Sequence, residues 1–374
     1  MKILLVGGAV RNKLLGLPVR DRDYLVLEAT VEDFLATHPG AKPVGKSFPV
    51  FIYNGEEYSF PRGAGLDEDF VRRDFTINAI AEDEDGTLHH HPLALEDINN
   101  RLLRPASEHS LSDDPLRAYR AARFLAELPG FTPHKDLVVA MRQAADLGTL
   151  GTPFAERVGQ ETLKSCASAR PGEFLRLLDQ GRCLAPWFSE LASASDIPAG
   201  PPKFHDSSLL EHTAQVMDKL AGDGMTVWMG LCHDLGKATT PASELPRHIG
   251  HETRGEALAK ALGERLRLPT RMVNAGADAA RWHMLAGNYP ELREATRVDL
   301  LFRLKSRGVL RELFRLVQAD KDQDHLPEAQ ADLDAALAVC LPPEARDQGE
   351  ASGDLLRSLR IKALRSAKKA VGRT

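Results

Sequence analysis

Residues 6–27, "VGGAVRNKLLGLPVRDRDYLVL", constrain the fold more than any other part of the chain. A glycine pair opens the stretch, an apolar helical pattern follows, and Asp21 and Asp23 stand two apart on an expected apolar strand, so they point to the same face. Two carboxylates placed there repel each other and lose hydration, and the arrangement therefore needs a compensating partner. Mg²⁺ is such a partner, because it removes the repulsion and attracts phosphate oxygens.

The glycine pair, Gly7 and Gly8, allows a tight turn that leaves backbone N–H groups bare. The following helix carries Arg11 and directs its N-terminus at an anion such as a triphosphate. In the order strand, glycine pair, helix, strand with two aspartates, these features indicate metal-dependent nucleotidyl transfer. Glu57, on the next hairpin, either supplies a third carboxylate or is an exposed strand glutamate.

Strand and helix patterns alternate from residue 1 to about 90, including a hairpin over 48–60 with Asn54-Gly55 as its turn. From about residue 100, aliphatic residues recur at three- and four-residue spacing, which predicts helices. Breaks rich in Pro, Gly and Ser occur at 196–208 and 342–354. We therefore expect an α+β head followed by an all-α neck, body and tail, with bounds 1–100, 101–205, 206–325 and 326–374.

The composition, with a net charge of −5, 43% hydrophobic and 27% charged residues, is typical of soluble globular proteins and excludes a simple polycation that binds nucleic acid everywhere. No apolar run is long enough to predict a membrane span. The four cysteines form no CxxC pair and are expected to be reduced thiols. We therefore expect a cytoplasmic protein with no membrane partner.

A second cluster is "VRRDFTINAIA" (71–81). Arg72 and Arg73 precede an expected helix that Asp74 would cap. Asn78 would follow one helical turn later. Arg73 could therefore meet a triphosphate, although a charged helix start is the simpler interpretation.

A third cluster is "DDPLRAYRAARF" (113–124). Pro115 suits the first turn of a helix, with Asp114 as its cap. Arginines recur every three residues at Arg117, Arg120 and Arg123 and share one broad face. Because aliphatic residues fill the other face, we expect the basic face to be open to a ligand.

The three clusters, in this order, resemble motifs of the bacterial class II tRNA nucleotidyltransferases, the CCA-adding enzymes. GGAVRNKLLG with DRD resembles the first motif, RRDFTINAIA the second, DDPLR the base-selecting motif and AERVGQE (155–161) a further helix motif. The resemblance implies a polymerase-β-like nucleotidyltransferase head in which Asp21 and Asp23 hold Mg²⁺. It also implies that CTP or ATP is bound by Gly8, Arg11, Arg73, Arg120 and Arg123.

By the same resemblance, Asp114 and Arg117 act as a protein template. A carboxylate accepts and an arginine donates, which matches the amino group and ring nitrogen of cytosine and adenine. Uracil and guanine present a carbonyl that Asp114 would repel. The chain departs from the family at Asn12, where an aspartate is usual, and at Asp113, where a glutamate is usual.

The middle of the chain contains "LLEHTAQ" (209–215), "LCHDLGK" (231–237), "HIGHETRGEA" (248–257), "RWHML" (281–285) and "LVQADKDQD" (316–324). An adjacent His-Asp pair, with an earlier His and a later Asp on other helices, is the pattern of HD-type metal phosphohydrolases. Imidazole and carboxylate ligands suit a transition metal such as Ni²⁺, Co²⁺ or Mn²⁺. We expect the metal ligands to be His212, His233, Asp234 and Asp320. His251 and His283 are candidate ligands of a second metal, and Lys237 could contact the phosphate. Some CCA-adding enzymes carry such a domain, and this implies phosphatase and 2′,3′-cyclic phosphodiesterase activity.

Seven basic residues and no acid lie between residues 355 and 374. Alone they predict a solvated helix end. In a tRNA enzyme they would bind the phosphates of the RNA backbone, and we assign this role to Arg357, Arg360, Lys362, Arg365, Lys368 and Lys369. The expected partners are the tRNA 3′ end, CTP and ATP, with the chain a monomer or a homodimer.

Two other functions compete with tRNA nucleotidyl transfer. Bacterial poly(A) polymerase shares the head and neck motifs, but the HD pattern disfavours it. An HD phosphohydrolase with a nucleotide-sensing, non-catalytic head is disfavoured by the intact Asp21 and Asp23.

The family carries a long flexible loop before the RRD motif that is thought to refit the pocket from cytosine to adenine. Only nine residues, 63–71, separate Arg62 from Arg72 here. Close relatives that add only CC show a similar deletion. A rigid template needs a mobile element to accept two bases of different size, so we lean toward CC addition. The alternative is a trimmed loop whose loss is compensated elsewhere, with the changed Asp113 as the candidate.

Overall fold

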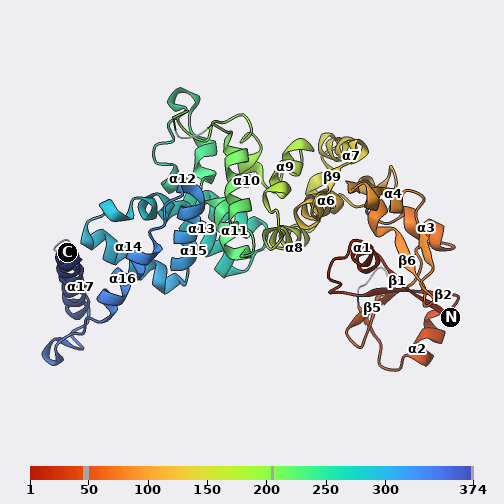
Figure 1. Cartoon of the computed structure of the whole chain (residues 1–374), viewed down its shortest axis with the longest axis horizontal. Coiled ribbons are helices and arrows are strands. Elements are labelled where there is room, and N and C mark those ends of the chain that lie inside the picture. Colours follow the sequence, from red (N-terminus) through yellow and green to blue (C-terminus); the bar gives the residue numbers. More distant parts are fainter. Residues whose placement is uncertain (45–49, 204–205, 372–374) are drawn as a thin grey trace. The chain divides into compact units, whose positions relative to one another are not determined.

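The computed structural model describes residues 1–44, 50–203 and 206–371, with side chains as far as Ser366 (Figure 1). The chain forms two compact units: Met1–Phe154 with Leu177–Pro186, and Ala155–Arg176 with Trp187–Thr374. The aspartate and arginine clusters of the sequence lie in the first unit, and the HD-type residues lie in the second. Each candidate site is therefore built within one unit.

A seven-stranded mixed sheet in the order β3-β4-β5-β2-β1-β6-β7 organises the first unit. Its strands are β1 Lys2–Val6, β2 Asp23–Leu27, β3 Lys42–Val44, β4 Val50–Tyr53, β5 Glu56–Ser59, β6 Ile80–Glu82 and β7 Leu88–His90. β2 pairs antiparallel with β1 and parallel with β5, so the start of β2 lies beside β5. The predicted hairpin turn is confirmed, because Asn54 and Gly55 have φ values of 51° and 85°. Residues 48–49 of that prediction lie outside the described residues.

Apolar side chains cover both faces of this sheet. Leu25 and Val26 are consecutive in β2 and point to opposite faces. Leu25 belongs to a cluster with Leu4, Val6 and Phe70, whereas Val26 belongs to one with Phe34, Phe51 and Tyr58. The remaining elements of this unit are α1 Gly8–Leu14, α2 Val31–Thr37, α3 Leu66–Val71, η1 Thr76–Asn78, α4 Ala94–Asn99, β8 Leu102–Leu103, α5 Ser110–Asp113, α6 Leu116–Glu127, β9 Thr132–Pro133, α7 Lys135–Asp146 and η2 Thr149–Gly151.

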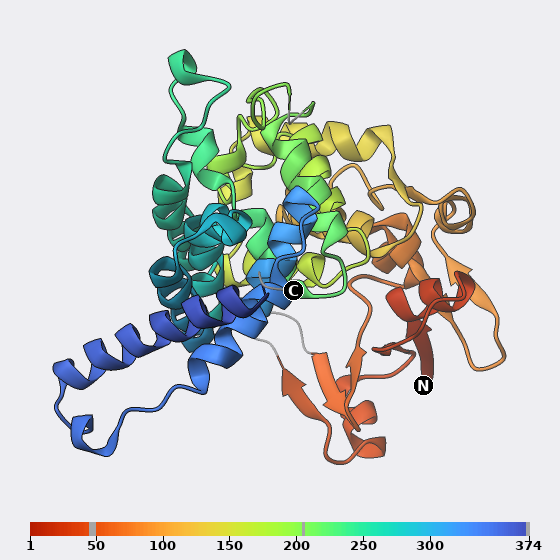
Figure 2. The ribbon, with the colours of Figure 1, turned by 60° about the vertical axis from the view of Figure 1, so that its left-hand side comes forward.

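Every regular element that the structure describes in the second unit is helical, as the spacing of aliphatic residues predicts. The α-helices are α8 Ala155–Cys166, α9 Gly172–Gln180 (which runs into the first unit), α10 Leu209–Lys219, α11 Gly224–Cys232, α12 His251–Arg265, α13 Thr270–Gly287, α14 Glu294–Arg307, α15 Leu310–Lys321, α16 Leu326–Leu337 and α17 Glu350–Val371. Single 3₁₀ turns are η3 Ser189–Leu191, η4 Leu235–Thr239, η5 Ala242–Glu244, η6 Tyr289–Glu291 and η7 Pro343–Ala345. The last helix, α17, packs on α14 and α16 through Leu364, Val298 and Ala336 (Figure 2).

Two local predictions are wrong. The segment after Arg73 forms only the 3₁₀ turn η1 before entering β6, because pairing of β6 with β1 and β7 prevails over local helix preference. The expected break over 342–354 is shorter, since α17 already begins at Glu350. None of the helices in the described part of the chain has the length and apolar character needed to cross a membrane.

Candidate active sites

The glycine pair opens the first site. Gly7 has φ 69° in the turn between β1 and α1, and a Cβ there would lie 3.2 Å from Arg73 Nη1. Glycine suits this position, because other residues are strained at such a φ and the neighbouring atom belongs to a site arginine. Gly8 begins α1, which buries Arg11 on its inner side.

Three carboxylates gather where β2 begins. The strand starts at Asp23, so Asp21 lies two residues before β2, and the expectation that both stand within a strand was wrong. Asp23 is directly opposite Glu57 in the parallel β2–β5 pair, and both side chains therefore leave the same face. Burial raises the pKa of Asp23, and the charges of Glu57 and Asp21 raise it further, against the charge of Arg73. A divalent cation would relieve this repulsion.

Asn78 connects the arginines of this site. Its Oδ1 accepts a hydrogen bond from Arg11 Nη1 at 2.5 Å, and its backbone carbonyl accepts one from Arg73 Nη1 at 3.3 Å. Its Nδ2 donates to Asp74 Oδ1 at 3.0 Å. Arg73 is also held by Asp69, whose Oδ2 lies 2.9 Å from Nε. One amide side chain thus links α1 to the RRD segment.

Asp74 does not cap a helix; it pairs with Arg120. Arg120 Nε and Nη2 lie 3.0 and 2.6 Å from Asp74 Oδ2. Burial alone would raise the pKa of Asp74, but the Arg120 guanidinium, the Asn78 amide and the charge of Arg117 together outweigh burial and hold that pKa well below its usual range. Arg123, on the same helix, pairs with Glu127. The face expected to be open is therefore largely occupied, and Arg117 and Arg123 are each only 8% exposed.

The predicted template residues, Asp114 and Arg117, lie near the start of α6. Asp114 Oδ1 accepts a hydrogen bond from the backbone N–H of Leu116, close to the predicted cap. Arg117 donates four hydrogen bonds, to the carbonyls of Arg72 and Arg73 and to the carbonyl and hydroxyl oxygens of Ser110. Burial lowers the pKa of Arg117, partly offset by Asp74. The guanidinium of Arg117 thus braces the RRD backbone in this state.

Sequence reasoning missed several partners in this site. Asp69 stands four residues before Arg73, and that spacing alone could have predicted the ion pair. Asp74 and Arg120 are 46 residues apart, and no local pattern pairs them. The same holds for the contact of the Phe124 ring with Arg11, whereas Arg120 and Arg123 precede Phe124 on the same helix and their contacts with the ring follow from sequence spacing.

The second site is a buried cluster of histidines and aspartates around Asp234, which follows α11 and is 2% exposed. Two sets of three residues have ligand atoms close enough to hold a metal ion, and they share Asp234. The first set adds His212 from α10 and His233, and the second adds His251 from α12 and His283 from α13. The nitrogens (all Nε2) of these four histidines lie 3.5, 3.1, 3.3 and 3.5 Å, respectively, from an Asp234 carboxylate oxygen. A cluster of histidines and aspartate that can hold a metal ion is therefore present, as predicted, although neither set includes Asp320, which stays a predicted ligand.

Backbone carbonyls determine which histidine nitrogen faces the centre. The Nδ1 atoms of His233, His251 and His283 lie 2.7, 2.7 and 3.0 Å from carbonyl oxygens, which only accept. Each Nδ1 therefore carries the proton, and in the neutral ring Nε2 presents its lone pair inward. His251 Nε2 and His283 Nε2 are 3.2 Å apart, and His233 Nε2 and Asp234 Oδ1 are buried with no hydrogen-bond partner among the residues that the structure describes. Converging lone pairs of this kind fit a bound cation.

Positive charge keeps Asp234 ionised when no cation is bound. Burial alone would raise the pKa of Asp234, but the protonated form of His233 and the ammonium of Lys237 hold it well below the usual value, and a bound cation would take the place of the His233 proton. Lys237 Nζ lies 2.7 Å from Asp234 Oδ2 and also donates to the carbonyl of Ala199. Asp320, from α15, lies 3.1 Å from His212. Burial would lower the pKa of His212, but hydrogen bonds to Asp234 and Asp320 raise it to about 9.

The basic residues of α17 have different surroundings. Arg357 pairs with Asp299 at 2.6 Å, Arg365 lies 3.5 Å from Glu294, and Arg360 stacks on Phe302 at 3.9 Å. Lys362 is exposed. The side chains of Lys368 and Lys369 lie outside the described residues.

The fold and the two sites define a two-centre class of protein, with a nucleotidyltransferase-type head and a separate HD-type metal site. A family model described as "HD domain" matches residues 209–323. A "Multifunctional CCA protein" of Xanthomonas campestris is 38% identical over 409 residues, covering 98% of this chain and 99% of that protein. The protein of the same name from Stenotrophomonas maltophilia is 37% identical over 414 residues, covering 98% and 100%. The chain belongs to the family of multifunctional CCA proteins.

Solved structures show the same fold. The CCA-adding enzyme of Bacillus stearothermophilus in complex with CTP matches with a TM-score of 0.63 and 24% identity, covering 100% of this chain and 95% of that one. The Thermotoga maritima CCA-adding enzyme complexed with tRNA matches with a TM-score of 0.65 and 18% identity, covering 96% and 86%. The predicted fold class, a nucleotidyltransferase head followed by a helical body with an HD domain, is confirmed.

Proposed function

We propose that this chain matures and repairs tRNA 3′ ends without a nucleic-acid template. It adds two C residues from CTP, and ATP is the candidate donor of a terminal A. The observation that carries the proposal is the placement of Asp23 and Glu57 on one sheet face, within the electrostatic reach of Arg73 and Arg120. Phosphoryl transfer needs carboxylates that bind a metal ion and guanidinium groups that bind the phosphates, and this arrangement places the two side by side. The family and its relatives' names support the same activity.

Asp21 and Asp23 would hold Mg²⁺, with Glu57 as a third carboxylate. Mg²⁺, when bound, supplies charge neutralisation at the phosphates. The tRNA 3′-hydroxyl oxygen bonds to the α-phosphorus, pyrophosphate leaves, and the hydroxyl proton passes to a nearby carboxylate or water. The incoming nucleotide would be bound by Gly8, Arg11, Arg73, Arg120 and Arg123.

Base selection would fall to Asp114 and Arg117. Arg117 donates to carbonyls of the RRD segment in this state, so reading a base requires the guanidinium to exchange some of those hydrogen bonds for the base edge. Asp114 would accept from the amino group of cytosine or adenine and repel a carbonyl.

The second unit would hydrolyse phosphate esters at the Asp234 cluster, as a phosphatase and a 2′,3′-cyclic phosphodiesterase. We assign the ligands to His212, His233, Asp234 and Asp320, with His251 and His283 serving a second metal. Ni²⁺, Co²⁺ or Mn²⁺ suits these donors and would activate the attacking water. To bind a substrate phosphate, the ammonium group of Lys237 would give up its contact with Asp234 or its hydrogen bond to the Ala199 carbonyl.

Whether the terminal A is added stays a prediction, and we lean toward CC. The short connection before the RRD motif is tied at both ends: Asp69 accepts from the backbone N–H of Arg62 at 3.3 Å and from Arg73 at 2.9 Å. Arg72 donates back to the Arg62 carbonyl. These contacts favour a rigid connection. A tRNA ending in CC, given ATP alone, tests the hypothesis, and efficient addition of A would overturn it.

The tRNA contacts of α17 would come mainly from Lys362, Lys368 and Lys369, because Arg357, Arg360 and Arg365 contact the protein itself. We further propose a cytoplasmic location and a monomer or homodimer. The division into head, neck, HD domain and tail at 1–100, 101–205, 206–325 and 326–374 likewise stays a prediction.

The decisive experiment supplies the purified chain with tRNA transcripts that end at the discriminator base, after C or after CC, and with each labelled nucleotide in turn. We expect incorporation of two C residues and no use of UTP or GTP. Asp23→Asn is the matched inactive control. Long tails made from ATP alone would instead favour poly(A) polymerase activity, and no incorporation would refute the proposal.

A further inference from the structure

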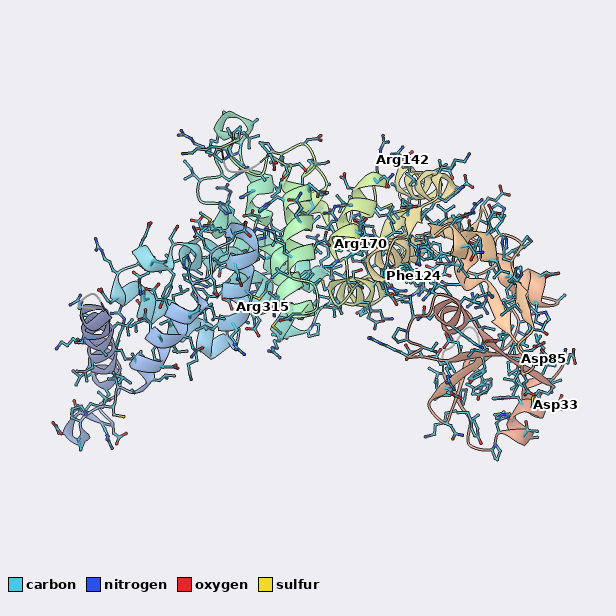
Figure 3. The ribbon with its side chains drawn as sticks, viewed as in Figure 1. Asp33, Asp85, Phe124, Arg142, Arg170 and Arg315 are labelled. Atoms are coloured by element: carbon cyan, nitrogen blue, oxygen red, sulfur yellow. The ribbon has the colours of Figure 1, made fainter. Side chains whose placement is uncertain are left out.

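Three of the arginines assigned to the triphosphate lie against one aromatic ring. The guanidinium carbons of Arg123, Arg11 and Arg120 are 3.9, 5.0 and 5.7 Å from the ring centroid of Phe124. All three distances fall within the cation–π range of about 6 Å. Phe124 is carried by α6 (Figure 3), as are Arg120 and Arg123, whereas Arg11 comes from α1.

Gathering three cations around one ring has an electrostatic cost. The pKa of Arg11 is lowered to about 10, first by burial and also by the charges of Arg123 and Arg120, against the charges of Glu127 and Asp74. An aromatic ring reduces this cost, because its face is electron-rich. Unlike a carboxylate, the ring has no net charge, so it does not cancel the positive charge that a triphosphate needs.

Arg11 shows the use of neutral partners most clearly. Its three hydrogen bonds go to the side-chain amide oxygens of Asn12, at 3.1 and 2.8 Å, and of Asn78, at 2.5 Å. Neither partner is an anion. The Phe124 ring is a further uncharged group in direct contact with this guanidinium, whereas Glu127 and Asp74 act on it only through their charges.

We propose that Phe124 is a positioning residue of the nucleotide site, whose ring holds Arg11, Arg120 and Arg123 in place. Arg120 and Arg123 also pair with carboxylates, so the ring matters most at Arg11, where it positions the guanidinium without cancelling the positive charge that the triphosphate needs. This inference rests on the proposed function of the first unit. It predicts that the electron density of the ring contributes to nucleotide affinity beyond the ring's shape.

A purely structural role is the competing explanation, since Phe124 is 5% exposed and packs edge-on against Phe75 at 5.6 Å. Shape and electron density can be separated by replacing Phe124 with phenylalanine carrying one, two or three fluorine atoms, introduced by nonsense suppression. Fluorination weakens the electron-rich face with little change in shape. The matched control is the same series at Phe75, which is fully buried beside Phe124 and has no guanidinium against it among the described residues.

We expect KM for CTP to rise stepwise along the Phe124 series, by up to about tenfold for the trifluoro ring, with a smaller change in kcat. Phe124→Leu should raise KM at least as much, and Phe124→Tyr should restore it. The Phe75 series should leave KM unchanged. If KM stays constant along the Phe124 series, or rises equally in both series, the positioning role of Phe124 is refuted.

The two hypotheses fail in different ways. A wild-type chain that adds no nucleotide to tRNA would refute the proposed function. In that case the affinity of the same fluorinated proteins for CTP, measured by calorimetry, would still test the positioning role of Phe124 directly. A chain that adds nucleotides but shows no dependence on ring electron density would refute only the role of Phe124.

Discussion

The pair of Asp74 and Arg120 allows a quantitative test of how the first site is assembled. Asp74 Oδ1 accepts hydrogen bonds from Asn78 at 3.0 Å and from the backbone N–H of Phe75 at 2.8 Å, whereas Oδ2 accepts two from Arg120. Asp74→Asn preserves the first oxygen. It replaces the second with an N–H group that points at two guanidinium donors, so both hydrogen bonds from Arg120 are lost.

The expected loss of stability follows from these contacts. A hydrogen bond to a charged group contributes about 1.5–3 kcal/mol, so two of them amount to roughly 3–6 kcal/mol. Arg120 is one-third exposed, at 32%, and water replaces part of the interaction. We therefore expect Asp74→Asn to lower the free energy of unfolding of the first unit by about 2–3 kcal/mol, and the loosened Arg120 to raise KM for CTP.

The effect should depend on pH in a defined direction. Because Arg120, Asn78 and Arg117 together outweigh burial, the pKa of Asp74 in the folded state lies well below its unfolded value of about 3.9. A depressed folded pKa contributes stability that is fully present above the unfolded pKa and is lost as pH falls toward the folded pKa. The difference between wild type and Asp74→Asn should thus be largest near pH 7 and shrink below about pH 4.

The assay must report on the first unit alone. The three tryptophans, Trp187, Trp228 and Trp282, all lie in the second unit, so tryptophan fluorescence follows that unit and serves as an internal control. Hydrogen exchange of peptides from α6, measured at increasing urea concentrations, gives the free energy of unfolding of the first unit. Asp67→Asn, exposed on α3, is the matched control. A loss below about 0.5 kcal/mol at pH 7, or a difference that stays constant down to pH 3, would refute the reasoning.

Three further predictions concern the two sites. Asp23→Asn should reduce nucleotide addition by at least about 10³-fold while tRNA retention on a filter stays within about twofold, because the carboxylate acts on the phosphates and not on tRNA; near-normal addition would remove Asp23 from the site. Asp234→Ala should abolish metal-dependent hydrolysis of 2′,3′-cyclic nucleotides and the rise in melting temperature on adding Mn²⁺, with nucleotide addition unchanged, since the shared ligand of both metal sets is lost; hydrolysis that survives would place the chemistry elsewhere. Arg117→Ala should lower incorporation of CTP and raise the relative use of UTP or GTP, measured by competition between labelled nucleotides, because the main donor to the base edge is gone; unchanged selectivity would assign the template to other residues.

The sequence by itself determined the class of protein and the types of its two sites. Asp21 and Asp23 can be recognised as a candidate metal site from the sequence, because the signal is their spacing of two and the apolar strand that follows. His233 and Asp234 are recognisable because they are adjacent and flanked by histidines on expected helices. Such patterns can be read from the sequence because their defining residues are close together in the chain.

Tertiary structure decided which partners these residues have. Asp74 was expected to cap a helix, but the pairing of β6 with β1 and β7 prevents that helix, and Asp74 meets Arg120 across 46 residues. Arg117 was expected on an open face, but the packing of α6 buries it against the RRD backbone. The ring of Phe124 meets Arg11 only because α1 and α6 approach each other. These contacts depend on how distant segments pack, and packing is set by the burial of the whole core and not by any local pattern.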